Sequence, residues 1–194
     1  YHLEDSSDFA LDIQNLCRTL EKDYDFLIMC NPNNPTSSAV TQEELRKILT
    51  FCRQKEIFVM IDETYVEFRE FENLMVLRGV SKFFAAPGMR LGYGITGNKE
   101  LLSKIKNRQI PWSINSLGAF AGELLVQDKD YISRTRQLIL KEREKLYQEL
   151  LKLSSFKVFP AFANFLLLKI IKPGLTASNV FEACILQNLI IRDC

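Results

Sequence analysis

The sequence contains a single histidine, His2, at its second position. Serine-hydrolase triads, Cys–His pairs and His-based metal sites would therefore all have to use the extreme N-terminus. The five cysteines are odd in number, widely spaced and never arranged as Cys-x-x-Cys, which predicts reduced thiols. Cys30 and Cys52 lie in apolar segments and are interpreted as small core residues. Most hydrolase and metalloenzyme classes are excluded, and we expect no metal.

Long apolar runs and an excess of one charge are also absent. The stretches 165–168 and 170–171 are separated by Lys169 and fall far short of the ~20 residues that span a bilayer. Residues 1–5 lack the basic start and apolar middle of a secretory signal. With 25 basic and 24 acidic residues, the net charge of +1 gives no electrostatic reason to bind nucleic acid or a membrane. We expect a cytoplasmic protein that binds a small molecule.

What the sequence does contain is an alternation of apolar strands with amphipathic helices over 194 residues, 47% of them hydrophobic. This alternation predicts an α/β fold with a mostly parallel sheet and crossover helices. Thr41 and Glu44 form a capping-box pattern at the start of a helix that runs to about Lys55. Asn98 is placed to cap a helix that ends before Pro111. Four strands are predicted in the first hundred residues, at 25–30, 57–61, 74–77 and 91–95.

The second half of the sequence predicts a different organisation. Residues 116–153 have a helical pattern that is broken near Asp128. They are followed by strands at 157–159 and 164–170, a helix at 176–187 and a last segment at 189–192. We therefore expect three parts: 1–115 as the core of a large domain, 116–153 as linking helices and 154–194 as part of a small α+β domain.

Polar residues that suit one kind of chemistry follow the predicted strands. In chain order they are Asn34-Pro35, Asp62 with Tyr65, Ser81-Lys82 and Arg90. Open α/β sheets bind ligands at the carboxyl ends of their strands. Pyridoxal phosphate chemistry needs a lysine amine for the aldehyde, a carboxylate for the pyridine nitrogen and anchors for the phosphate and ring hydroxyl. Taken singly, each motif could equally be a turn, a cap or a surface ion pair; together they supply every part.

In this order the motifs resemble the class I/II aminotransferases of fold type I, with their Asn-Pro, Asp-x-x-Tyr and Ser-Lys-(x)₇-Arg pattern. The resemblance implies pyridoxal 5'-phosphate as cofactor and a homodimer when the protein is full length. It also implies that Lys82 forms the Schiff base and moves the substrate proton, and that Asp62 pairs with the pyridine nitrogen. Asn34 and Tyr65 would hydrogen-bond the ring hydroxyl.

The resemblance assigns the phosphate to Arg90, whose rigid fork of donors can bind two oxygens, with Ser81 as a second ligand. Gly79 stands where these families usually carry a serine or threonine, so one anchoring hydroxyl is missing. The segment between Glu67 and Asn73 is shorter than usual, through either a deletion or a missing loop. The resemblance covers the middle and later part of a family member, without its glycine-containing phosphate loop and substrate-binding arginine, as in a fragment.

Three functions remain open. Segments 111–115, 163–165 and 191–194 look like those of histidinol-phosphate aminotransferases, and the first and last also like those of threonine-phosphate decarboxylases. Asn115 either approaches the substrate or caps a helix. We expect a transaminase acting on small amino acids and 2-oxo acids. The alternatives are a decarboxylase of a phosphorylated amino acid and a non-catalytic module with this fold.

Overall fold

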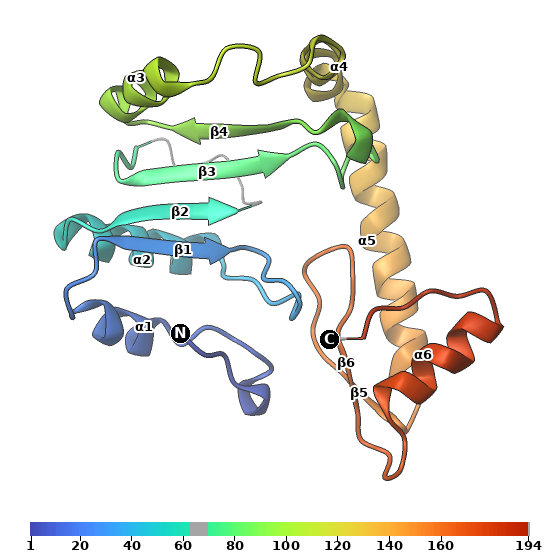
Figure 1. The fold of residues 1–194 in the computed structure, drawn as a ribbon. Coiled ribbons are helices and arrows are strands. Elements are labelled where there is room, and N and C mark those ends of the chain that lie inside the picture. The colour runs from blue at the N-terminus through green and yellow to red at the C-terminus, as the bar shows by residue number, and fades with distance from the viewer. Residues whose placement is uncertain (63–69, 194) are drawn as a thin grey trace.

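The structure, a computed structural model, describes residues 1–62 and 70–193. Its larger part is a four-stranded sheet in the order β1-β2-β3-β4, and a two-stranded sheet lies apart from it (Figure 1). The expected α/β class is confirmed. The strands are β1 (Phe26–Cys30), β2 (Phe58–Asp62), β3 (Leu74–Gly79), β4 (Gly92–Thr96), β5 (Phe156–Val158) and β6 (Leu168–Ile170).

The helices begin where their capping residues predict. Thr41 Oγ1 accepts the Glu44 N–H at 3.2 Å and the Glu44 carboxylate accepts the Thr41 N–H at 2.7 Å, which confirms the capping box. The Asn98 side chain caps the helix after β4, also as predicted. The helices are α1 (Ile13–Leu20), α2 (Gln42–Gln54), α3 (Lys99–Arg108), α4 (Ser116–Gln127), α5 (Lys129–Leu151) and α6 (Ala177–Leu186), with 3-10 turns η1 (Asp5–Ser7) and η2 (Pro87–Met89).

The predicted break at Asp128 is confirmed. Asp128 has a non-helical backbone (φ −75°, ψ 80°), and its side chain accepts the N–H of Tyr131 at 2.8 Å to begin α5. The 23-residue α5 then runs from the sheet to the two-stranded sheet (Figure 1). Within the described ranges, no helix combines the length and apolarity needed to cross a membrane.

The register of the larger sheet aligns one edge. β1, β2 and β3 are parallel, with Cys30 opposite Asp62 and Asp62 opposite Leu77. β4 is antiparallel to β3, and Gly92 lies opposite Gly79. The carboxyl ends of three strands and the start of the fourth therefore share one edge, which faces α5 (Figure 1).

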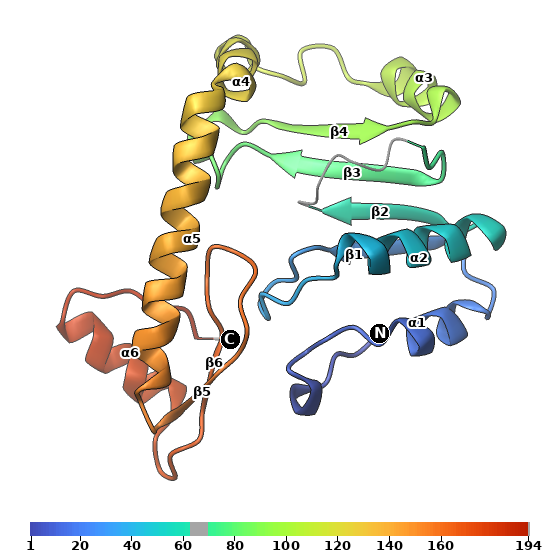
Figure 2. The same cartoon turned by 180° about the vertical axis from the view of Figure 1, so that it is seen from behind.

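The main core lies on one face of this sheet. Helix α2 lies over β1 in Figure 2, and its residues Ile48, Leu49 and Cys52 are completely buried. They pack with Val59 and Ile61 of β2 and with Leu16 and Leu20 of α1, a helix that the sequence analysis did not predict. Burial raises the pKa of the Cys52 thiol to about 11, so it remains a neutral core residue as expected.

Within the described residues, the opposite face of the sheet is open along β1, which corrects two predictions. β1 was expected to be a buried strand, yet Ile28 is 67% exposed and Phe26 43% exposed. Cys30 is exposed as well and is not a core residue. The reason is that α1 and α2 pack on the same face, so the alternate residues of β1 point away from them. The Phe26 and Phe58 rings stack on this open face, with centroids 5.5 Å apart.

Residues 154–193, here called the C-terminal lobe, contain less strand than predicted. The strand expected at 164–170 is ordered as β6 over Leu168–Ile170 alone, because β5 offers three residues to pair with it. Residues 189–192 form no helix or strand. The helix expected at 176–187 is present as α6 and is capped by Thr176.

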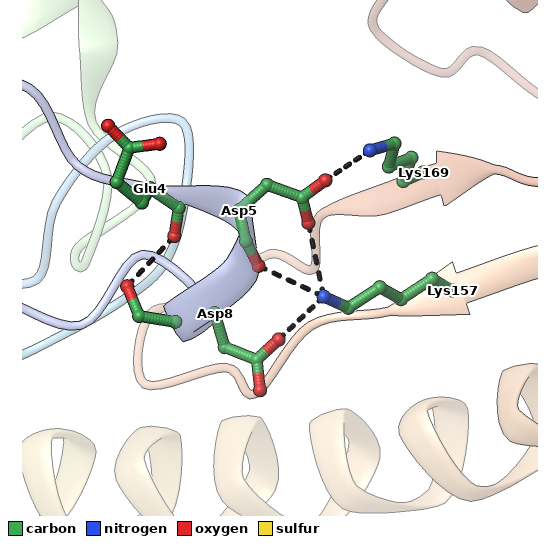
Figure 3. Close-up of polar contacts among 6 residues, drawn as sticks. Glu4, Asp5, Asp8, Lys157 and Lys169 are labelled. Atoms are coloured by element: carbon green, nitrogen blue, oxygen red, sulfur yellow. Dashed lines mark hydrogen bonds and ion pairs between the residues drawn. The ribbon is translucent and has the colours of Figure 1, made fainter.

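Charged side chains join the C-terminal lobe to the N-terminal turn η1 (Figure 3). Lys157 Nζ lies 3.1 Å from Asp5 Oδ1 and 2.8 Å from Asp8 Oδ1, and Lys169 pairs with the other Asp5 oxygen. Hydrogen bonds from Lys169 and then Lys157 hold the pKa of Asp5 below its ordinary value. The contribution of Asp5 to stability is therefore present above the ordinary pKa of aspartate and is lost as pH falls through the lowered one.

Because the main core lies on one face of the sheet, truncating a leucine on that face should lower stability more than truncating an exposed leucine. Leu49→Ala should lower the free energy of unfolding by about 2–5 kcal/mol, because Leu49 is fully buried. Leu138→Ala, at a helical position that is 59% exposed, is the matched control and should change it by about 0.5 kcal/mol or less. Urea unfolding of both variants measures this, and equal losses would contradict the assignment of the core to this face.

Candidate active site

The predicted site residues that the structure describes lie at the shared edge of the sheet or on loops that leave this edge. Asp62 ends β2, and its carbonyl accepts the N–H of Asn31 at 3.1 Å, so the Asn34 loop leaves β1 beside it. At the β3 and β4 end of the same edge, the N–H of Val80 donates to the Leu91 carbonyl at 3.2 Å. This bond brings together the two segments that carry Ser81-Lys82 and Arg90. Tyr65, the remaining predicted residue, lies outside the described residues.

The loop that carries Asn34 is locked by its own polar groups. Asn31, which is almost fully buried, accepts the N–H of Val40 at 3.0 Å and closes the base of the loop. Inside it, the N–H of Asn33 donates to the Ser38 carbonyl at 2.7 Å, and that of Ser37 to the Asn33 carbonyl at 2.8 Å. The Asn34 side chain is left exposed on a fixed backbone. The loop composition predicted a turn, but the supporting roles of Asn31 and Ser37 were missed.

Lys82 lies in a turn that packs against the aromatic ring of Tyr131. The N–H of Ala85 donates to the Lys82 carbonyl at 3.1 Å, and the Lys82 side chain is exposed. Tyr131 of α5 donates its hydroxyl to the Phe83 carbonyl at 3.4 Å and stacks on Phe84, with centroids 5.8 Å apart. The backbone next to Lys82 is thus fixed while its amine remains accessible. The role of Tyr131 was not predicted, because this residue is 49 positions from Lys82 in the sequence.

Arg90 sits in a tight turn supported by α4. Its backbone is left-handed (φ 49°), and its Nη1 donates to the Pro87 carbonyl at 3.3 Å. The neighbouring Met89 carbonyl accepts a hydrogen bond from Asn115 Nδ2 at 3.1 Å. Asn115 Oδ1 at the same time accepts the Gly118 N–H at 2.6 Å, so Asn115 is the helix cap, the second of its two predicted roles.

Two glycines let α4 approach this turn closely. A Cβ on Gly118 would lie 3.0 Å from the Met89 carbonyl oxygen, and one on Gly122 would lie 2.3 Å from Leu91 Cδ2. Both glycines lie on one face of the helix because they are four residues apart. Larger side chains there would push the helix away from the turn that carries Arg90. The predictions from sequence did not include this packing.

The side chains at this edge match the functional groups of pyridoxal 5'-phosphate. Lys82 could provide an amine for the aldehyde and Asp62 a carboxylate for the ring nitrogen. Asn34 could provide an amide for the ring hydroxyl, and Arg90 with Ser81 donors for the phosphate. A Cβ on Gly79 would meet nothing within 4 Å, so a serine or threonine side chain would fit at this position. The hydroxyl that the families named above usually carry there is absent from this sequence. The donor set therefore fits the cofactor, with one phosphate ligand fewer.

Sequence comparison finds relatives with two activities. The chain is 34% identical to the histidinol-phosphate aminotransferase of Methanopyrus kandleri, over 96% of this chain and 49% of the relative. It is 31% identical to the threonine-phosphate decarboxylase of Salmonella typhimurium, over 92% of this chain and 51% of the relative. The chain therefore spans about half the length of the curated relatives it matches.

Structural comparison finds the same fold. The histidinol-phosphate aminotransferase of Clostridium acetobutylicum superimposes with a TM-score of 0.86 at 31% identity, over 96% of this chain and 59% of that one. That of Sinorhizobium meliloti, solved in complex with pyridoxal-5'-phosphate, superimposes with a TM-score of 0.76 at 18% identity, over 93% and 52%. The fold is that of the pyridoxal-phosphate-dependent aminotransferases of fold type I.

The family assignment rests on the whole chain. The family described as Aminotransferase class I and II matches residues 1–194, which is every residue of the sequence. Its cofactor is pyridoxal 5'-phosphate, in agreement with the side chains at the sheet edge. The chain belongs to the class I and II aminotransferase family.

Proposed function

We propose that the whole protein is a pyridoxal-phosphate-dependent aminotransferase that transfers an amino group between an amino acid and a 2-oxo acid. The observation that carries the proposal is the shared edge of the sheet: Asp62 ends β2 there, Asn34 and Lys82 follow the ends of β1 and β3, and Arg90 precedes the start of β4. Phosphorylated amino acids are the preferred substrate class, because relatives that act on histidinol phosphate and threonine phosphate are both about one third identical.

Each residue has a chemical task in this proposal. When bound, the cofactor supplies an electron sink for the bond that breaks at the substrate α-carbon. The Lys82 Nζ would hold the cofactor aldehyde and would move a proton to and from the substrate α-carbon. The Asp62 carboxylate would keep a proton on the ring nitrogen, since a nearby negative charge favours the protonated form. Lys82, Asp62 and Tyr65 are thus the proposed catalytic residues.

The remaining residues orient the cofactor. Asn34 and Tyr65 hydrogen-bond the ring hydroxyl, Arg90 binds the phosphate through its fork of N–H donors, and Ser81 adds a hydroxyl. Tyr131 and Asn115 support the backbone next to Lys82 and Arg90, from which the amine and the guanidinium project. The missing hydroxyl at Gly79 would weaken phosphate binding rather than prevent it.

The division of the chain and its assembly are part of the proposal. Residues 1–115 would belong to the cofactor-binding domain, 116–153 to linking helices and 154–194 to the small domain. A homodimer is supported by the apolar side chains that stand exposed on α4 and just before it: Trp112 is 98%, Leu117 76% and Phe120 67% exposed.

A decarboxylase acting on a phosphorylated amino acid is the second candidate, favoured by the threonine-phosphate decarboxylase relative. The bond at the substrate α-carbon that stands perpendicular to the cofactor ring is the one that breaks. Losing the proton leads to transamination and losing the carboxylate to decarboxylation. Lys82, Asp62, Asn34 and Arg90 serve both, so the groups that orient the substrate decide. We favour transamination because most enzymes with this motif set transaminate.

Replacing Asp62 tests the cofactor geometry. Asp62→Asn in the full-length protein should retain covalently attached cofactor but lower kcat by about 10²-fold or more, because a neutral amide does not favour the ring proton. Asp23→Asn, in the exposed turn before β1, is the matched control and should leave kcat unchanged. Steady-state kinetics measure both, and near-normal turnover by Asp62→Asn would assign the role to another residue.

The type of reaction can be decided with the full-length protein, pyridoxal phosphate and one amino donor at a time. The donors are glutamate, histidinol phosphate and O-phosphothreonine. A transaminase converts the cofactor to its pyridoxamine form without releasing carbon dioxide, and this is the expected result. The visible spectrum and the carbon dioxide released are followed together.

The other outcomes identify the alternatives. Carbon dioxide released from O-phosphothreonine, with the cofactor returned to its original form, would establish the decarboxylase. A protein that takes up the cofactor but changes no donor would be the non-catalytic module.

A further inference from the structure

The backbone of Ala163, in the C-terminal lobe, forms hydrogen bonds with two other parts of the chain. Its N–H donates to Ser37 Oγ at 2.8 Å, and its carbonyl accepts from Arg143 Nη1 at 3.0 Å. The N–H of the preceding Phe162 donates to both the carbonyl and the hydroxyl oxygen of Ser37, at 2.9 and 3.0 Å. Ser37 thus fastens the loop of residues 160–164 to the Asn34 loop, while Arg143 fastens it to α5.

The backbone at Ser37 is strained. Its φ is 59°, a left-handed conformation that costs free energy for any residue with a Cβ, and it is completely buried. Such a conformation persists where the surroundings hold it in place, and it is concentrated at functional positions. Glycine would adopt it without strain but would lack the hydroxyl. What the serine adds is the Oγ that accepts the N–H groups of Phe162 and Ala163.

The contacts of Ser37 connect both sides of the candidate active site. Ser37 lies three residues after Asn34 in the same locked loop. Through Ala163 it reaches Arg143 on α5, and the other end of α5 carries Tyr131, which bonds the Phe83 carbonyl next to Lys82. Coupling between the two ends of this chain of contacts is measured as a linked change at both ends.

We propose that Ser37 is a positioning residue that couples cofactor binding at the Asn34 loop to the placement of the C-terminal lobe. The inference rests on the proposed function, since the ligand that it invokes is pyridoxal phosphate. Binding that orders the Asn34 loop would hold Ser37 Oγ more firmly against residues 162–163, and the lobe would be fixed in turn.

The test measures hydrogen exchange at single amides of the full-length protein, with and without pyridoxal phosphate. Ser37→Ala removes the hydroxyl and keeps the strain, whereas Ser37→Gly removes the hydroxyl and relieves the strain. Ser38→Ala is the matched control, because the Ser38 hydroxyl contacts Thr36 Oγ1 within the same loop. Thermal unfolding of all variants is recorded, and Ser37→Gly should melt at a higher temperature than Ser37→Ala.

In the unliganded protein, the Ala163 amide should exchange about threefold to tenfold faster in both Ser37 variants, because it loses its acceptor. In the wild type and in Ser38→Ala, the cofactor should slow exchange at both 31–38 and 162–163. In the Ser37 variants it should slow exchange at 31–38 but no longer at the Ala163 amide, whose acceptor is the missing hydroxyl, even in the well-folded glycine variant.

Two results would overturn the coupling: an Ala163 amide that exchanges at the wild-type rate in both Ser37 variants, or a cofactor-linked change at the Ala163 amide that persists in them. A wild-type protein that binds the cofactor without any change at 162–163 would overturn it too. A wild-type protein that does not take up pyridoxal phosphate would instead overturn the proposed function and the coupling with it, and the visible spectrum distinguishes that case.

Discussion

The parallel register of β1, β2 and β3 is the constraint on which the site depends. Parallel strands bring their carboxyl ends to one edge of the sheet. Residues that are far apart in the sequence therefore lie at the same edge. Asn34 follows β1, Asp62 ends β2 and Lys82 follows β3. β4 runs the other way, and for that reason its beginning, with Arg90, reaches the same edge. The site residues need little more from the sheet than this alignment.

Rigid loops do the remaining positioning. Asn31 and Ser37 lock the loop of Asn34, the aromatic ring of Tyr131 supports the turn of Lys82, and Asn115 with two glycines of α4 supports the turn of Arg90. In each case a buried or capping side chain fixes a backbone from which a polar side chain projects. Catalysis by a bound cofactor depends on such fixed geometry, because an angular error of the reacting groups is costly in rate.

Much of the fold could be predicted from local patterns. The capping box at Thr41, the cap at Asn98 and the break at Asp128 each depend on neighbouring residues, and each was located correctly. The exposure of Ile28 was not predicted, because an apolar strand has the same pattern whether one or both of its faces are covered. The predicted length of β6 was wrong for a similar reason, because the length of this strand is set by its pairing with β5.

The site shows the same division between local and distant information. Asn34, Asp62 and Lys82 could be chosen because they follow predicted strands, and Arg90 because it completes the motif order of the family that the sequence resembles. Tyr131 and Ser37 could not, because their roles come from contacts with residues 48 to 126 positions away. No periodicity or motif encodes such a contact, which depends on how α5 and the C-terminal lobe pack against the sheet.

The assignment of Lys82 as the residue that holds the cofactor can be tested directly. Full-length protein is incubated with pyridoxal phosphate, reduced with borohydride and digested, and its peptides are mapped by mass spectrometry. We expect to find the reduced cofactor on Lys82, and Lys82→Ala should have neither the adduct nor the yellow colour. An adduct on a different lysine, or an unchanged visible spectrum in Lys82→Ala, would contradict it.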